Sequence, residues 1–142
     1  MSQLKQLEAI AQELINLYEI TAPPIPVETM LQRPIDNMWQ AVDLNQMSGS
    51  FLSVRDLYSP RMSIARLLAR HVVGSSWGQA RNVSQLLNND EDMLRVFTRM
   101  LVMPTEMMEA LSSGARHNIA ISMLFEVPEE DARLRLQEWN EA

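Results

Sequence analysis

The sequence predicts a mostly helical α+β fold, with about six to seven helices and one small antiparallel sheet, in a single domain over residues 1–142. The first observation is that apolar residues recur every three or four positions along most of the chain, which is typical of amphipathic helices. The second is size, because 142 residues of which 46% are hydrophobic can bury one core. The third is a short stretch near the middle where apolar and polar residues alternate instead, as in strands.

The first helix is expected over about residues 2–18. Its apolar residues form one stripe opposite a charged side, and Ser2 is a suitable N-cap. The proline-rich segment 21–26 ends this helix, because proline fixes φ and has no N–H to donate. A second, short helix over residues 27–32 has to stop before Pro34.

The small sheet is expected in the stretch that follows. Residues 38–44 and 50–57 are short, partly alternating runs on either side of a connection that contains Ser-Gly. Ser59 and Pro60 then supply an N-cap and a first-turn proline for a helix over about residues 60–74.

The second half of the chain is expected to be helical. A proline directly after Met103 and a later Ser-Ser-Gly turn mark two helix ends. Four helices are predicted there, over about residues 90–102, 105–111, 118–125 and 128–139.

Composition excludes several classes of protein. Without cysteine the chain has no disulfide, no thiolate nucleophile and no cysteine metal site. A net charge of -6 argues against direct nucleic-acid binding, and DNA phosphates would repel the three acids at 129–131 that begin the last helix. No apolar run approaches the ~18 residues that cross a membrane, and the N-terminus does not read as a secretory signal. We therefore expect a cytoplasmic protein.

Four sequence blocks, in their order and spacing, resemble the ImmA/IrrE family of metallopeptidase domains. The blocks are DLNQMSGSFL (43–52), SPRMSIARLLARH (59–71), FTRMLVMP (97–104) and IAISMLFEVPEEDARLRL (119–136). The resemblance implies a zincin-like α+β scaffold over nearly the whole chain. It also implies zinc-dependent endopeptidase chemistry, and family members act on helix-turn-helix repressors.

The positions that would carry this chemistry hold the wrong residues. The family's two zinc-binding histidines, its general base and its third zinc ligand fall on Arg66, Arg70, Leu67 and about Met93. Arginine has no lone pair to give a cation, and leucine can neither take nor give a proton. We therefore expect a catalytically inactive pseudo-peptidase with no cofactor, which acts as a regulatory module by binding a protein. Family analogy suggests a repressor as the partner, in a bacterial or phage setting.

Two alternatives stay open. One is an active metallopeptidase with a relocated metal site built from His71, His117 and either Glu91 or Asp92. A lone histidine on an apolar helix face is more often a core residue than a ligand. The other is a purely structural module that forms homo-oligomers through an exposed methionine cluster at residues 103–108.

Arg66 and Arg70 lie one turn apart on one side of the predicted helix, opposite its apolar side. They could form a solvated face paired with the acids at 91–92, which would contribute only ~0–1 kcal/mol per pair. They could instead line a cleft that holds a carboxylate or an acidic peptide by forked hydrogen bonds.

Overall fold

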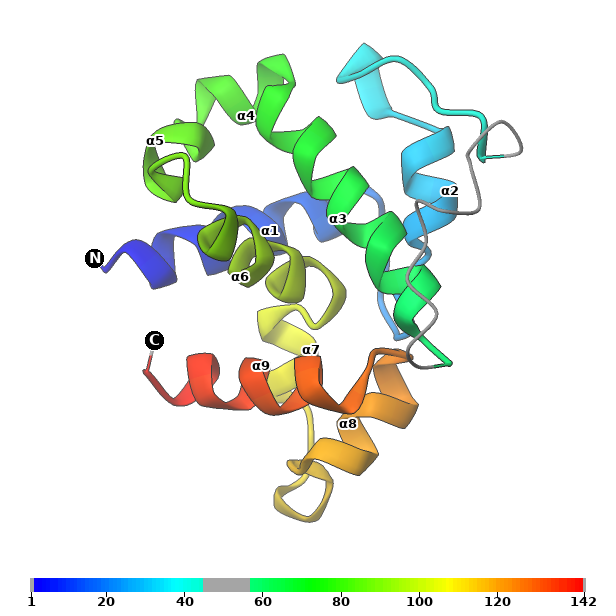
Figure 1. Cartoon of the computed structure of the whole chain (residues 1–142), viewed down its shortest axis with the longest axis vertical. Coiled ribbons are helices and arrows are strands. Elements are labelled where there is room, and N and C mark those ends of the chain that lie inside the picture. Colours follow the sequence, from blue (N-terminus) through cyan, green and yellow to red (C-terminus); the bar gives the residue numbers. More distant parts are fainter. Residues whose placement is uncertain (1, 45–56, 142) are drawn as a thin grey trace.

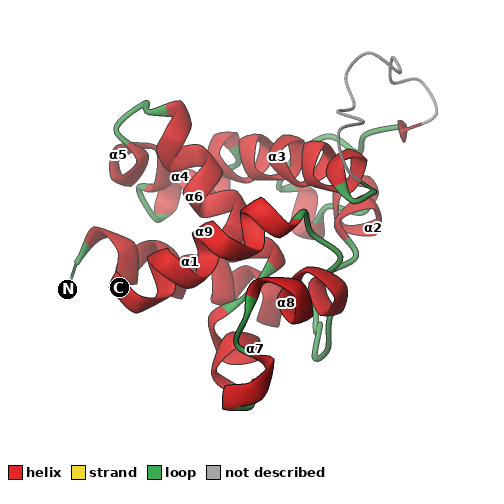
Figure 2. Cartoon of the chain, turned by 60° about the horizontal axis from the view of Figure 1, so that its bottom comes forward, coloured by secondary structure: helices red, strands yellow, loops and turns green. Residues whose placement is uncertain are grey.

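The chain is all-helical over the residues that a computed structural model describes, 2–44 and 57–141 (Figure 2). No strand is present in those two stretches, so the predicted α+β class with an antiparallel sheet, and with it the zincin-like scaffold, is wrong. Residues 38–44 form no strand, and residues 50–56 of the other predicted strand lie outside the described stretches.

The alternating pattern near residue 40 comes from a segment that packs on a helix without pairing as a strand. Met38 and Trp39 are buried, and the indole Nε1 of Trp39 donates a hydrogen bond to the carbonyl oxygen of Leu31 at 3.0 Å. Met38 and Trp39 are consecutive and both are buried, whereas burial would alternate along a strand with one buried side, so the partly alternating sequence did not indicate a strand here.

Nine α-helices make up the described fold, instead of the six to seven expected. They are α1 (Gln3–Leu17), α2 (Val27–Gln32), α3 (Ser59–Gly74), α4 (Ser76–Ala80), α5 (Val83–Leu87), α6 (Glu91–Val102), α7 (Thr105–Glu109), α8 (Asn118–Phe125) and α9 (Glu129–Glu141), with two short 3-10 turns, η1 (Ile35–Asn37) and η4 (Ser113–Ala115). None of the described helices has the length and apolar character needed to cross a lipid bilayer.

Helix α6 is the central element (Figure 1). It packs against α1, α3 and α9, while α8 and α9 form a helical hairpin and α2 covers part of α3. From Leu94 to Met103 most of its residues are buried, among them Phe97, which is fully enclosed. Its residues Glu91, Arg95 and Arg99 are spaced four apart on one side of this amphipathic helix, where it meets α3 and α9.

Local sequence signals explain where the two site-bearing helices begin and end. Pro60 lies in the first turn of α3, as predicted. The Asp90 side chain caps α6 by accepting the N–H of Asp92 at 2.9 Å, and the acids in the first turn suit the helix dipole. Helix α6 ends at Val102, just before Met103 and Pro104, because the residue before proline disfavours helical φ/ψ.

The periodicity did not predict α4 and α5, which join α3 to α6. Each has five residues, barely more than one turn, so no apolar period can be recognised. Ser75 caps α4 by accepting the N–H of Gly78 at 3.0 Å. A side chain at Gly78 would collide with the carbonyl oxygen of Val72, so the glycine allows α4 to turn back closely onto α3.

Candidate functional site

Arg70 forms the ion pair that the sequence suggested. Its Nη2 bonds to Oε1 of Glu91, the first residue of α6, and so joins α3 to α6. Both side chains are about half exposed, at 54% and 55%. A pair so open to water contributes little to stability and exchanges readily for another partner.

Arg66, one turn earlier on α3, pairs with no carboxylate in the described part of the chain. It is half-buried, and its Nη2 donates to the hydroxyl of Ser63 at 3.1 Å. Burial lowers the pKa of Arg66, and the neighbouring charge of Arg95 lowers it further, while Asp131 opposes both. The guanidinium is therefore held partly out of water beside a second positive charge.

Arg95 supplies that second charge from α6. It is exposed, and it forms neither a hydrogen bond nor an ion pair with the part of the chain that the structure describes. It lies four residues after Glu91, on the same side of α6. Three guanidiniums from two packed helices therefore share one surface. We call Arg66, Arg70 and Arg95 the arginine face.

A buried ion-pair cluster lies next to the arginine face. Arg99, one turn beyond Arg95, is 8% exposed, and its Nε lies 3.0 Å and 3.2 Å from the two carboxylate oxygens of Glu138 on α9. Its Nη1 is 3.7 Å from Asp131. Burial raises the pKa of Asp131, although Arg99 and Arg66 oppose the shift. Arg99 thus already engages Asp131 and Glu138, and no acid of α9 lies within ion-pairing distance of Arg66 or Arg95.

The structure separates the other two positions implied by the peptidase resemblance from this surface. Leu67 and Met93 are partly buried and pack against the hydrophobic core. Arg66, Arg70 and Glu91 are the predicted site residues that come together. Sequence reasoning missed Arg95 and Arg99. The spacing of residues 91, 95 and 99, four apart on one helix, was the signal that could have found them.

The two histidines of the alternative metal site lie in different parts of the fold. His117 caps α8, where its Nδ1 accepts the N–H of Ala120 at 3.4 Å. His71 is in the last turn of α3, with its ring centroid 6.3 Å from that of Trp39. The loop after α8 meets the opposite end of α3, where Arg61 donates to the carbonyl oxygen of Glu126 at 3.2 Å (Figure 1). Ten residues, about 15 Å of helix, separate Arg61 from His71.

Within residues 2–44 and 57–141, no three His, Asp or Glu side chains are grouped so that they could hold a metal ion. The residues that the relocated site would need are therefore not assembled in the described part of the chain.

His71 makes the stability of the fold depend on pH. Burial lowers the pKa of His71 below its ordinary value of about 6.5, so the unfolded chain binds a proton more readily than the folded one. Stability should therefore fall as the pH drops below about 6.5, and His71→Gln should weaken this fall. Urea midpoints of both proteins at pH 7.5 and pH 5 measure the effect. Parallel pH profiles for the two proteins would contradict this role for His71.

The methionine cluster proposed for oligomerisation is not exposed. Met103 and Met108 are buried, at 0% and 1% exposure, and Met107 is half-buried against the core. The exposed apolar residues gather instead on α8, where Ile119 and Met123 are 56% and 69% exposed. The core needs the methionines after Pro104, because α7 packs directly on α1.

Comparison with known proteins finds no match among family models, curated proteins or solved structures. The resemblance to ImmA/IrrE peptidases therefore has no independent support. The function has to be argued from the arginine face itself.

Proposed function

We propose that this chain is a non-enzymatic protein-binding module, and that its arginine face binds an acidic segment of a partner protein. One observation carries the proposal: Arg66 and Arg95 lie close enough for one to lower the pKa of the other, and neither has a carboxylate partner among the described residues. Placing two such groups together is unfavourable in the isolated chain and becomes favourable when an anion lies between them.

A carboxylate suits this position better than other ligands. Guanidiniums hold carboxylates through forked, charge-assisted hydrogen bonds, which are stronger than bonds between neutral groups. Arg70 can join in at little cost, because its pair with Glu91 is half exposed and worth only ~0–1 kcal/mol. One acidic side chain could therefore bridge Arg66 and Arg95, and a second could replace Glu91 on Arg70.

The surroundings of the arginine face favour an acidic peptide over a nucleic acid. The chain carries a net charge of -6, and α9 begins with Glu129, Glu130 and Asp131. Asp131 is near enough to affect the pKa of Arg66. A continuous phosphate backbone needs a broad cationic surface, whereas a short acidic segment needs only the three guanidiniums.

A solvated charged surface is the simpler interpretation, and it accounts for Arg70, which is exposed and paired. It does not account for Arg66. Arg66 is a half-buried guanidinium whose hydrogen-bond partner is a hydroxyl, and no carboxylate of the described residues lies within ion-pairing distance of it, so its lost hydration is only partly compensated by the more distant Asp131 and Glu91. The binding hypothesis supplies a close countercharge from outside the chain.

Peptide binding tests the proposal. A fluorescein-labelled decapeptide of alternating glutamate and serine should bind the wild-type protein, and the signal should be measured by fluorescence anisotropy. We expect Arg66→Gln with Arg95→Gln to weaken binding by at least about ten-fold, since a hydrogen bond to a charged group contributes about 1.5–3 kcal/mol. Raising the salt concentration should weaken wild-type binding as well.

The matched control removes two positive charges elsewhere. Arg116→Gln with Arg133→Gln has the same net charge as the test variant, and both arginines are exposed. Binding by this variant should change by less than about two-fold, because neither arginine belongs to the arginine face and Arg133 is already paired with Glu130. Equal losses in the two variants, or no binding of the glutamate peptide by the wild type, would overturn the proposal.

A further inference from the structure

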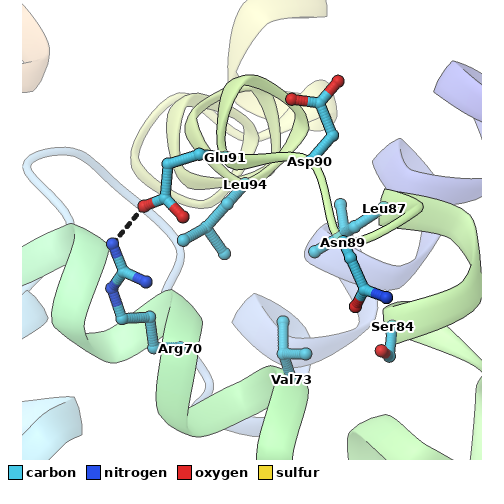
Figure 3. Close-up of a pocket in the computed structure, with 8 residues that line it drawn as sticks. All are labelled: Arg70, Val73, Ser84, Leu87, Asn89, Asp90, Glu91 and Leu94. Atoms are coloured by element: carbon cyan, nitrogen blue, oxygen red, sulfur yellow. Dashed lines mark hydrogen bonds and ion pairs between the residues drawn. The ribbon is translucent and has the colours of Figure 1, made fainter.

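A cavity of about 260 Å³ opens beside Arg70, at the end of the arginine face (Figure 3). It lies between α3, α5 and the start of α6. Figure 3 shows the Arg70–Glu91 pair on one side of this space, and Ser84 and Asn89 on the other. The cavity therefore adjoins the surface to which the proposed partner would bind.

The floor of the cavity is aliphatic. Val73 from α3 and Leu94 from α6 point into it, and Leu87 from α5 completes it (Figure 3). Leu87 and Leu94 belong to the core and are 4% and 6% exposed, while Val73 is half-buried. An aliphatic side chain placed on this floor would remove its own apolar surface from water, which favours binding.

The size of the cavity limits what it can hold. Pockets for drug-sized ligands range from about 300 to 1,000 Å³, so this one is smaller than a typical small-molecule site. An amphipathic helix would need several apolar anchors along a groove. A single aliphatic side chain fits within this volume and can lie against the aliphatic floor.

We propose that the acidic partner segment places one leucine, isoleucine or valine side chain in this cavity. The inference rests on the proposed function, and it adds an apolar anchor to the charge recognition. Charge alone would make the arginine face bind many acidic chains. The anchor selects among them, because a segment without an aliphatic residue at this position leaves the cavity unfilled and makes no contact with its floor.

The positions of Arg66 and Val73 on α3 also set the spacing that the partner segment needs between its acidic residue and its aliphatic residue. Val73 lies seven residues beyond Arg66 on α3, which is about 10 Å along the helix axis. A polyproline II segment rises about 3.1 Å per residue with three residues per turn, so residues three apart lie about 9 Å apart on one side. The acidic residue and the aliphatic residue should therefore be separated by three positions.

A register scan tests this inference. In labelled serine-rich decapeptides that carry one Glu-Glu pair, a leucine is placed one to five positions from the pair on either side. We expect the leucine three positions away, on one side, to bind about five- to ten-fold more tightly than serine there, since the cavity would bury part of the leucine side chain. The other registers should bind like the serine peptide.

Filling the cavity provides the decisive variant. Ser84 is an exposed residue at its rim, so Ser84→Phe should occupy the space without removing any core side chain. It should abolish the gain from leucine and leave the affinity for the serine peptide unchanged. Gln85→Phe, at the next and equally exposed position of α5, is the control and should keep the gain. Circular dichroism checks that both variants fold.

The outcomes separate the two proposals. If leucine gives no gain in any register, or if the gain persists in Ser84→Phe, the cavity is not an anchor site, while charge recognition still stands. If the glutamate peptides do not bind at all, both proposals fail. A gain from leucine that is lost in Ser84→Phe and kept in Gln85→Phe supports the anchor.

Discussion

Glu8→Ala is expected to lower the free energy of unfolding by about 3–5 kcal/mol, because it leaves a buried cation without its countercharge. Arg135 on α9 is completely buried, and its Nη1 bonds to Oε1 of Glu8 on α1. Its Nε donates to the carbonyl oxygen of Met103 at 3.0 Å. The second oxygen of Glu8 accepts the hydroxyl of Thr105 at 2.8 Å. One carboxylate therefore ties three segments together.

Urea denaturation of a matched set measures this effect. Glu13→Ala changes the same residue type on the same helix, but Glu13 is 47% exposed and paired with Arg81 on the surface, so its loss should cost less than about 1 kcal/mol. The double change Glu8→Leu with Arg135→Met removes both charges, and it should be more stable than Glu8→Ala alone. Similar small losses of unfolding free energy for Glu8→Ala and Glu13→Ala would show that the buried pair stabilises the fold no more than the exposed pair does.

Arg99→Met is expected to cost about 2–3 kcal/mol, since it removes charge-assisted bonds from two largely buried acids. Glu138 is 12% exposed and Asp131 is 20% exposed, and neither has another cation within ion-pairing distance among the described residues. Arg133→Met is the control, because Arg133 forms an exposed pair with Glu130 on the same helix. Its loss should leave the urea midpoint nearly unchanged, because the pair is open to water.

The cost of Arg99→Met should also depend on pH. Burial raises the pKa of Asp131, and Arg99 is the largest influence opposing that rise. Without Arg99 the Asp131 carboxyl should take up a proton more readily in the folded chain than in the unfolded chain. Acid then stabilises the variant relative to the wild type, so the difference in unfolding free energy should narrow between pH 7 and pH 4. A difference that widens in acid would contradict this account.

The Arg99 cluster also bears on the proposed function. Arg99 joins α6 to α9 one turn from Arg95. It pairs with Asp131 and Glu138, which could otherwise pair with Arg66 or Arg95. Arg66 and Arg95 are therefore left without these carboxylate partners because Arg99 already binds them. Arg99→Met should accordingly weaken binding of the glutamate peptide, since Asp131 and Glu138 would then compete for the face.

The sequence by itself determined most of the helices. Periodicity and punctuation predicted α2 and α8 at their observed bounds, and α1, α3, α6 and α9 within two residues at each end. These signals are local: a cap, a proline or an apolar stripe acts within a few residues of where it is read. The sequence also determined that residues 66 and 70 carry charges with no lone pair for a metal.

Tertiary structure alone decided which charges meet. Glu8 and Arg135 are 127 positions apart in the chain, and no local pattern pairs them. The partly alternating run near residue 40 fitted a strand, and only its packing on α2 made it an irregular segment. Likewise, Arg95 became a neighbour of Arg66 because α6 packs against α3. Such pairings follow from how the buried faces of distant helices fit together, and that fit depends on the whole core at once.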